Sequence, residues 1–82
     1  MIEIKFDKNK SIAYDHETKI GECEFIELED AWNIIHTEVD TSYQGQGIAR
    51  KLVECIFENA KKAGKGIIAD CSYAKKIIEN NN

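Results

Sequence analysis

Between Val39 and Leu52 the sequence reads Val-Asp-Thr-Ser-Tyr-Gln-Gly-Gln-Gly-Ile-Ala-Arg-Lys-Leu. An apolar run comes before this stretch and an amphipathic pattern begins inside it, which predicts a strand, a glycine-rich loop and the start of a helix. Gly45 and Gly47 let the backbone approach a ligand without a side chain in the way. The first N–H groups of the helix point back at the loop, so the stretch predicts a site for an anion such as a phosphate.

After the loop, apolar residues recur every four positions and predict an amphipathic helix from Gly47 that stops at Gly64. The residues expected on its buried stripe are Ile48, Leu52, Ile56 and Ala60, widened by Ala49, Val53, Cys55, Phe57 and Ala63. A short buried strand follows over Gly66–Asp70 and should run parallel to the strand before the loop, because strand–helix–strand connections return that way. Ser72 is expected to cap a last helix whose inner face carries Tyr73, Ala74, Ile77 and Ile78, and whose end frays over Asn80–Asn82.

Before the loop, alternating apolar and polar residues predict an antiparallel meander of four strands. The expected strands are Met1–Phe6, Ser11–Asp15, Ile20–Leu28 and Ala31–Val39. The fourth has apolar residues at both parities, which predicts that it is central and covered on both faces. The predicted fold class is therefore α+β: a mixed sheet with antiparallel N-terminal strands, a strand–glycine loop–helix–strand unit and a short C-terminal helix.

The composition limits the possible functions of the chain. Its 82 residues are expected to form one domain, 1–82, and the net charge of −4 argues against binding to nucleic acid. No signal peptide or membrane-spanning run is apparent, so we expect a cytoplasmic protein that does not contact membranes. The three cysteines fit no zinc pattern with His16 or His36, so we expect reduced thiols and no metal.

Two common nucleotide motifs do not fit the glycine-rich loop. A P-loop needs four residues between its glycines, followed by Lys and Ser or Thr, and that pattern is absent. A dinucleotide fingerprint needs a small residue three positions after its second glycine, and Arg50 stands there. Asp70 has the spacing of a ribose-binding acid, but two glycines are a weak signal for this fold.

The segment Gln44-Gly45-Gln46-Gly47-Ile48-Ala49 resembles the pyrophosphate loop of the GNAT N-acetyltransferase superfamily. His36-Thr37-Glu38-Val39 before it and Cys71-Ser72-Tyr73 after it resemble a minimal stand-alone branch of that superfamily, over about Ile20 to Asn80. The resemblance implies that acetyl-CoA places its pyrophosphate on the backbone of Gln44, Gly45, Gln46, Gly47, Ile48 and Ala49. It also implies that the pantetheine arm pairs with the backbone near Val39. Full-size members have further elements on the acceptor side, so here the acceptor site is expected to be open, shallow or completed by a partner.

Cys71 and Tyr73 are the candidate acids. Cys71 is expected at the start of the last helix, whose N-terminus can acidify a thiol, although Asp70 opposes this. It would either protonate the leaving thiolate or carry the acetyl group itself, and the structural alternative is a buried packing cysteine. Tyr73 is the competing acid, or a residue that packs at the helix start.

His36 and Glu38 are the candidate bases. They share one parity of the fourth strand, so both side chains point to the same face. Either could take the proton of the amine, directly or through a water, or both could be buried members of a structural hydrogen-bond network. The acidic positions nearby would favour a cationic acceptor or simply form a solvated face, and they are Glu22, Glu24, Glu27, Glu29 and Asp30.

We therefore predict an acetyl-CoA-dependent N-acetyltransferase that acts on a small-molecule or peptide amine, as a monomer or weak homodimer. The alternative is a non-catalytic acyl-CoA-binding or interaction module, which the short acceptor side would suit.

Overall fold

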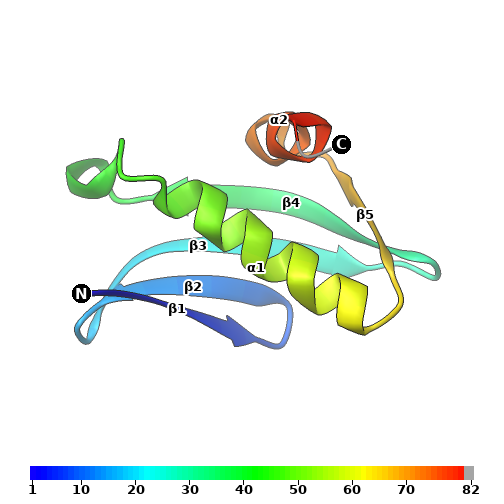
Figure 1. The fold of residues 1–82 in the computed structure, drawn as a ribbon, viewed down its shortest axis with the longest axis horizontal. Coiled ribbons are helices and arrows are strands. Elements are labelled where there is room, and N and C mark those ends of the chain that lie inside the picture. The colour runs from blue at the N-terminus through cyan, green and yellow to red at the C-terminus, as the bar shows by residue number, and fades with distance from the viewer. Residues whose placement is uncertain (81–82) are drawn as a thin grey trace.

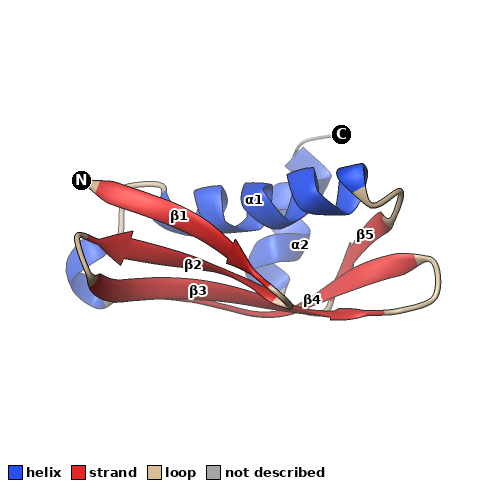
Figure 2. Cartoon of the chain, turned by 90° about the horizontal axis from the view of Figure 1, so that it is seen from below, coloured by secondary structure: helices blue, strands red, loops and turns tan. Residues whose placement is uncertain are grey.

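The computed structural model describes residues 1–80, and the burial of side chains as far as Ile77. Within residues 1–80 the chain forms a five-stranded sheet with two α-helices on one of its faces (Figures 1 and 2). The elements are β1 Ile2–Asp7, β2 Lys10–Asp15, β3 Thr18–Glu27, β4 Ala31–Val39, the 3₁₀ turn η1 Thr41–Tyr43, α1 Ile48–Lys62, β5 Gly66–Ala69 and α2 Ser72–Asn80.

The strands lie in chain order, β1-β2-β3-β4-β5. The first four are antiparallel neighbours, and β5 runs parallel to β4, to which α1 connects it. The predicted fold class is confirmed, and the predicted strands differ from the observed ones by at most two residues at either end. Neither helix of the described part is long and apolar enough to cross a membrane.

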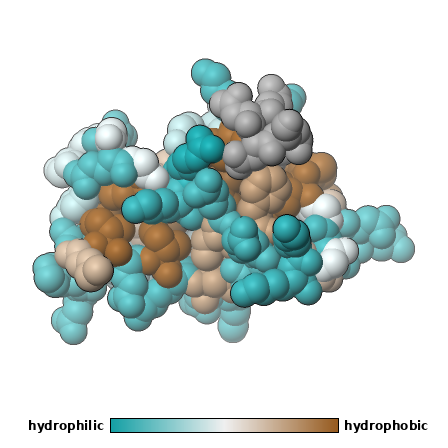
Figure 3. All heavy atoms as spheres, viewed as in Figure 1, coloured by the Kyte–Doolittle hydropathy of each residue, from teal (hydrophilic) through white to brown (hydrophobic). Residues whose placement is uncertain are grey.

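The core lies between α1 and the sheet. The buried stripe of α1 consists of Ile48, Leu52, Val53, Ile56 and Ala60, and it packs on Ala13, Cys23, Phe25, Trp32 and Ile34 of the strands. Each large apolar side chain buried in this way contributes about 1.5–3 kcal/mol. Polar side chains run along the outward side of α1 (Figure 3), so the helix has the amphipathic character that the sequence predicts.

Several predicted burials are wrong at the edges of this core. Ala63 is exposed because α1 ends at Lys62, and Cys55 is only partly buried at the margin of the stripe. In α2, Ala74 and Ile77 are buried as predicted, but Tyr73 is 44% exposed, because it lies about 100° around the helix from Ala74, at the margin of the buried stripe. The prediction that the end frays from Asn80 is wrong for that residue, which belongs to α2. The burial of Ile78 and the fraying at 81–82 lie outside what the structure describes.

A β-bulge interrupts β4. Glu24 pairs with His36 while the next residue, Phe25, pairs with Ile34, so Ile35 is an extra residue in β4. The bulge explains why apolar residues occur at both parities: Ile34 before it and Val39 after it both pack toward the helices. The prediction that β4 is covered on both faces is therefore wrong, and Ile35 is 42% exposed.

Gly21 allows β3 and β4 to lie close together under α1. A Cβ at this position would lie 2.9 Å from the Glu38 carbonyl oxygen and 3.3 Å from Val39 Cγ2. We expect Gly21→Ala to lower the free energy of unfolding by about 1–3 kcal/mol, because the strand backbone must move. Urea unfolding would measure the loss.

Gly66→Ala is the matched control for that measurement. Gly66 also lies in a strand, and a Cβ there would lie 3.7 Å from the nearest backbone oxygen, that of Asp30, which is an ordinary contact. The change should alter the stability by less than about 1 kcal/mol. Equal losses in the two variants would contradict the close approach at Gly21.

Candidate functional site

The glycine-rich loop joins β4 to α1 through a short polar turn. The Asp40 side chain accepts a hydrogen bond from the Ser42 N–H at 2.9 Å and so caps η1. Gly45 has φ +84° and Gly47 has φ +76°, a left-handed backbone that side chains disfavour. A Cβ at either glycine would meet nothing within 4 Å. Gly47 is the N-cap of α1 and, having no side chain, does not cap the N–H groups of the first helical turn.

A cavity of about 680 Å³ lies in front of this loop. Six of the seven residues predicted to bind the cofactor line it, and these are Val39, Gln44, Gly45, Gly47, Ile48 and Ala49. Gln46, the seventh, is exposed but is not part of the lining. The other lining residues come from β4, η1 and α2, and are Thr37, Glu38, Tyr43 and Tyr73.

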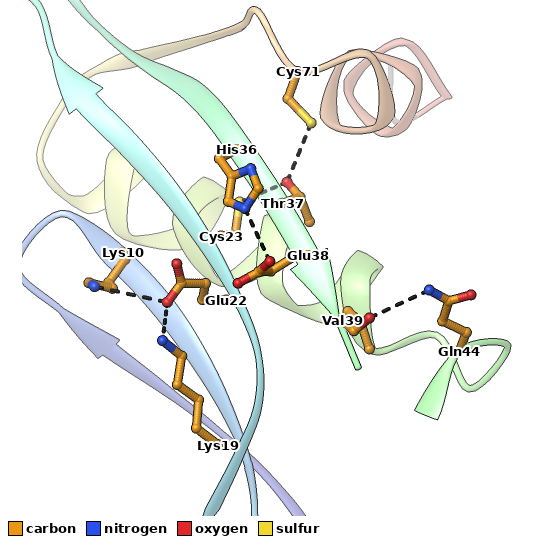
Figure 4. Close-up of polar contacts among 10 residues, drawn as sticks. All are labelled: Lys10, Lys19, Glu22, Cys23, His36, Thr37, Glu38, Val39, Gln44 and Cys71. Carbon is orange, nitrogen blue, oxygen red and sulfur yellow. Dashed lines mark hydrogen bonds and ion pairs between the residues drawn. The ribbon is translucent and has the colours of Figure 1, made fainter. Parts of the chain in front are cut away.

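The edge of β4 that faces this cavity has no strand beside it. The pairing of β4 with β5 ends at Ile34 and Ala69, one residue before β4 bulges. Beyond that point the Asp40 N–H donates to the Ile20 carbonyl on the other side of β4. Because alternate residues of an antiparallel pair point to opposite edges, Thr37 and Val39 direct their backbone groups to the open edge. The Val39 carbonyl accepts only a long bond, 3.5 Å, from Gln44 Nε2 (Figure 4).

Cys71 stands at the start of α2, on the helical side of β4. Its carbonyl accepts from the Lys75 N–H at 2.9 Å, so the N-cap is Cys71 and the prediction that Ser72 caps the helix is wrong by one residue. Burial raises the pKa of the Cys71 thiol, but hydrogen bonds from the Ala74 backbone, the Thr37 hydroxyl and the Tyr73 backbone outweigh it, so its pKa lies below the usual value. The Asp70 carboxylate accepts a hydrogen bond from Asn33 Nδ2 at 3.0 Å.

His36 and Glu38 lie on the other face of β4, which no helix covers (Figures 2 and 4). The two side chains share this face, as predicted, and His36 Nε2 lies 3.5 Å from Glu38 Oε2. Their side chains are 50% and 60% exposed, so the alternative of a buried structural network is wrong. They lie on the outer face because Thr37 between them and Val39 after them point toward the helices, and side chains alternate along a strand.

Glu22 is the buried acid of this outer face. It contacts Lys19 closely, and Lys10 Nζ lies 3.9 Å from Oε1, so two cations neutralise it. The hydrogen bond with Lys19 holds the pKa of Glu22 below its usual value. Ligand atoms of Glu22, His36 and Glu38 lie within 4.8 Å of one another, close enough to share a cation, but the two lysines already neutralise the most buried of these ligands. We assign no metal to this cluster.

Sequence reasoning missed two residues of the site. Thr37 lies between His36 and Glu38 and therefore points to the opposite face, where its Oγ1 lies 3.6 Å from Cys71 Sγ. Strand parity together with the parallel return of β5 would have found it. The second is Tyr43, whose hydroxyl donates to Asp15 Oδ2 at 2.6 Å and ties the loop to the end of β2. No pattern in the sequence signals that contact, because its partners are far apart in the chain.

Comparisons with known proteins agree on one family. The model of the GCN5-related N-acetyltransferase family matches residues 9–82. The solution structure of a GCN5-like protein from Staphylococcus aureus is 33% identical, with a TM-score of 0.74 over 96% of this chain and 79% of that one. No curated protein sequence matches the chain.

Two more distant structures share the fold. The ribosomal-protein-S18-alanine N-acetyltransferase of Escherichia coli is 17% identical, with a TM-score of 0.77 over 95% of this chain and 54% of that one. The PaiA N-acetyltransferase of Thermoplasma acidophilum, solved with coenzyme A, is 17% identical, with a TM-score of 0.74 over 89% of this chain and 49% of that one. The chain therefore spans about half the length of these two enzymes.

The three cysteines should ionise in a fixed order. Hydrogen bonds lower the pKa of Cys71, whereas burial raises the pKa of Cys55 and raises that of Cys23 to about 11. We expect alkylation by iodoacetamide, followed peptide by peptide with mass spectrometry across a pH series, to reach its midpoint at a lower pH for Cys71 than for Cys55. A midpoint at Cys71 equal to or above that of Cys55 would refute the ordering, and Cys55 serves as the internal reference.

Proposed function

Because the chain belongs to the GCN5-related N-acetyltransferase family, we propose that it binds acetyl-CoA and transfers the acetyl group to an amine. One observation carries the proposal: the cavity joins the glycine-rich loop, the open edge of β4 and the start of α2 in one continuous surface. The proposal takes residues 1–82 as one acetyltransferase domain. Three free thiols suit a reducing compartment, so we place the activity in the cytoplasm.

The loop and the strand edge offer the groups that a CoA molecule needs. Gly45, Gly47, Ile48 and Ala49 line the cavity at the positive end of α1, where free backbone N–H groups favour a pyrophosphate. The Val39 backbone, turned to the open edge of β4, can pair with the amides of a pantetheine arm as a neighbouring strand would. When bound, acetyl-CoA would supply the thioester that is attacked. The solved relative from Thermoplasma acidophilum holds coenzyme A, which supports this reading.

The amine acceptor reaches the site from the uncovered face of the sheet. Glu38 lines the cavity, and its carboxylate contacts the imidazole of His36 on the outer face. Either group can take the proton that the attacking amine must lose, directly or through a water. Both are half exposed, so a small-molecule or peptide amine can approach them without a rearrangement of the sheet.

Cys71 and Tyr73 stand on the helical side, where the departing thiolate must collect a proton. Tyr73 lines the cavity with a side chain that is 44% exposed. The pKa of Cys71 lies below the usual thiol value, so its thiol can protonate a CoA thiolate or, once ionised, carry the acetyl group itself. Intact mass after incubation with acetyl-CoA separates the routes: a hydroxylamine-sensitive adduct on Cys71 shows the covalent one.

Binding can be tested at the two left-handed glycines that flank α1. Gly47 has φ +76° and Gly64 has φ +73°, and a Cβ at either would meet nothing within 4 Å, so each change to Ala costs about 1–2 kcal/mol of stability. We expect only Gly47→Ala to weaken acetyl-CoA binding, on the order of tenfold, because it alone distorts the loop.

Backbone amide shifts during an acetyl-CoA titration would measure both affinities and should move at residues 44–49. A wild-type protein whose amides at 44–49 do not respond to millimolar acetyl-CoA would refute the proposed binding.

Catalysis can be tested at the outer face. We expect Glu38→Gln to lower the rate of amine acetylation by about 10²–10⁴-fold, the usual contribution of a general base. Glu27→Gln is the control, because it removes an exposed carboxylate of β3 that pairs with Trp32 and does not line the cavity. Binding of acetyl-CoA without acetylation of any amine would instead favour the non-catalytic module.

A further inference from the structure

Thr37 connects two cysteines on the helical side of β4. Its Oγ1 lies 3.3 Å from Cys23 Sγ and 3.6 Å from Cys71 Sγ (Figure 4). Cys23 and Thr37 are direct partners across β3 and β4, and Cys23 is completely buried. Thr37 also lines the cavity. A single hydroxyl therefore stands between a thiol of the core and the thiol at the start of α2.

The hydrogen-bonding capacity of these groups links their protons. A thiol can donate one hydrogen bond, a hydroxyl can donate one and accept two, and a thiolate can only accept. Cys23 remains a thiol at neutral pH, since burial raises its pKa to about 11. While Cys71 is a thiol, it can donate to Thr37 Oγ1, which leaves the hydroxyl proton of Thr37 free to point at Cys23. Once Cys71 is a thiolate, the Thr37 hydroxyl must donate to it, and Cys23 can then donate to Thr37.

We propose that Thr37 is a positioning residue for Cys71, and that its hydroxyl, held by the buried Cys23 thiol, changes from acceptor to donor when Cys71 loses its proton. This deepens the proposed function, on which it rests, because Cys71 is one of the two groups assigned to the departing thiolate. If Cys71 gives its proton to the departing CoA thiolate, the Thr37 hydroxyl turns and donates to the new thiolate of Cys71. If Cys71 attacks first, the same hydroxyl holds the thiolate that attacks.

Few charges face the Cys71 sulfur. From α2 it meets the backbone of Tyr73 and Ala74, and from β4 the backbone and hydroxyl of Thr37. Among the described residues, the titratable side chains on the helical side include the thiols of Cys23, from β3, and Cys55, from α1, and the phenol of Tyr73, from α2. His36 and Glu38 point away on the outer face, and Asn33 holds the Asp70 carboxylate. The Thr37 hydroxyl is therefore the side-chain donor best placed to set the proton affinity of Cys71.

Two substitutions at Thr37 separate the hydroxyl from its packing. Thr37→Val keeps the shape and removes the hydroxyl, whereas Thr37→Ser keeps the hydroxyl. In cysteine alkylation across a pH series, without acetyl-CoA, Thr37→Val should raise the midpoint of Cys71 by about one pH unit, the worth of one hydrogen bond to a charged group. Thr37→Ser should stay near the wild-type value, and the Cys55 midpoint should not move. An unchanged Cys71 midpoint in Thr37→Val, or an equal rise in Thr37→Ser, would overturn the proposal.

Cys23→Ala tests the contact between Cys23 and Thr37, which is the second hydrogen bond of the series that begins at Cys71. It leaves Thr37 in place but removes the thiol that holds its hydroxyl, so the Cys71 midpoint should rise by less than in Thr37→Val. No rise at all would refute the part assigned to Cys23. This variant also keeps the idea testable if Thr37→Val does not fold, which circular dichroism would reveal.

Activity separates this inference from the proposed function. Thr37→Val should acetylate an amine about tenfold more slowly than the wild type, the effect of raising a catalytic pKa by one unit, and Thr37→Ser should restore most of the rate. A wild-type protein that neither binds acetyl-CoA nor acetylates an amine would refute the proposed function. The alkylation midpoint of Cys71 in the variants would still test the role of Thr37 independently. A normal rate in Thr37→Val, despite a shifted midpoint, would show that the contact does not serve the transfer.

Discussion

β4 is hydrogen-bonded along both edges in its first half and along one edge in its second half. The change occurs at Ile35, where β4 bulges against β3 and β5 ends its pairing. Backbone groups inside a protein need partners, so the open edge near Val39 is where a ligand rich in amides can bind. The left-handed glycines then turn the chain so that the N-terminus of α1 faces the same space. The cavity thus exists because β4 continues beyond the point where its pairing with β5 ends.

This arrangement also sorts the reactive side chains by face. Strand alternation sends Thr37 toward the helices, where it meets two thiols, and sends its neighbours His36 and Glu38 to the uncovered side. Groups suited to protonating a sulfur and groups suited to deprotonating an amine are thereby kept on opposite sides of one strand. Acyl transfer needs both a group that takes the proton of the amine and a group that protonates the leaving thiolate, and β4 carries a candidate for the first on one face and lies beside candidates for the second on the other.

Local patterns in the sequence predicted most of the fold, because the period of two in the strands and the period of four in α1 each reflect burial on one face. The patterns gave a wrong prediction for β4, where the alternation of inward and outward side chains changes phase at the bulge. Apolar residues occur at both parities of β4 because of the bulge at Ile35. The sequence pattern alone cannot distinguish such a bulge from a strand that is covered on both faces. The predicted cofactor residues lie within one short stretch, residues 39–49, and six of them line one cavity. Thr37, Cys23 and the Tyr43–Asp15 bond instead depend on distances across the sheet. The prediction that Tyr73 lies on the buried face of α2 was also wrong, because a helix of about two turns has too few residues to define its buried stripe.

The bulge has a consequence for how related chains are aligned. Shifting a strand by one residue normally turns every later side chain to the wrong face. Here Ile34 already points inward and His36 outward, so a chain without Ile35 would keep every other residue of β4 on its present face and opposite its present partner. Such a chain would have a straighter β4, while β5 would still end at Ala69, just before α2. A one-residue gap at Ile35 in an alignment would therefore leave the rest of β4 in register with β3.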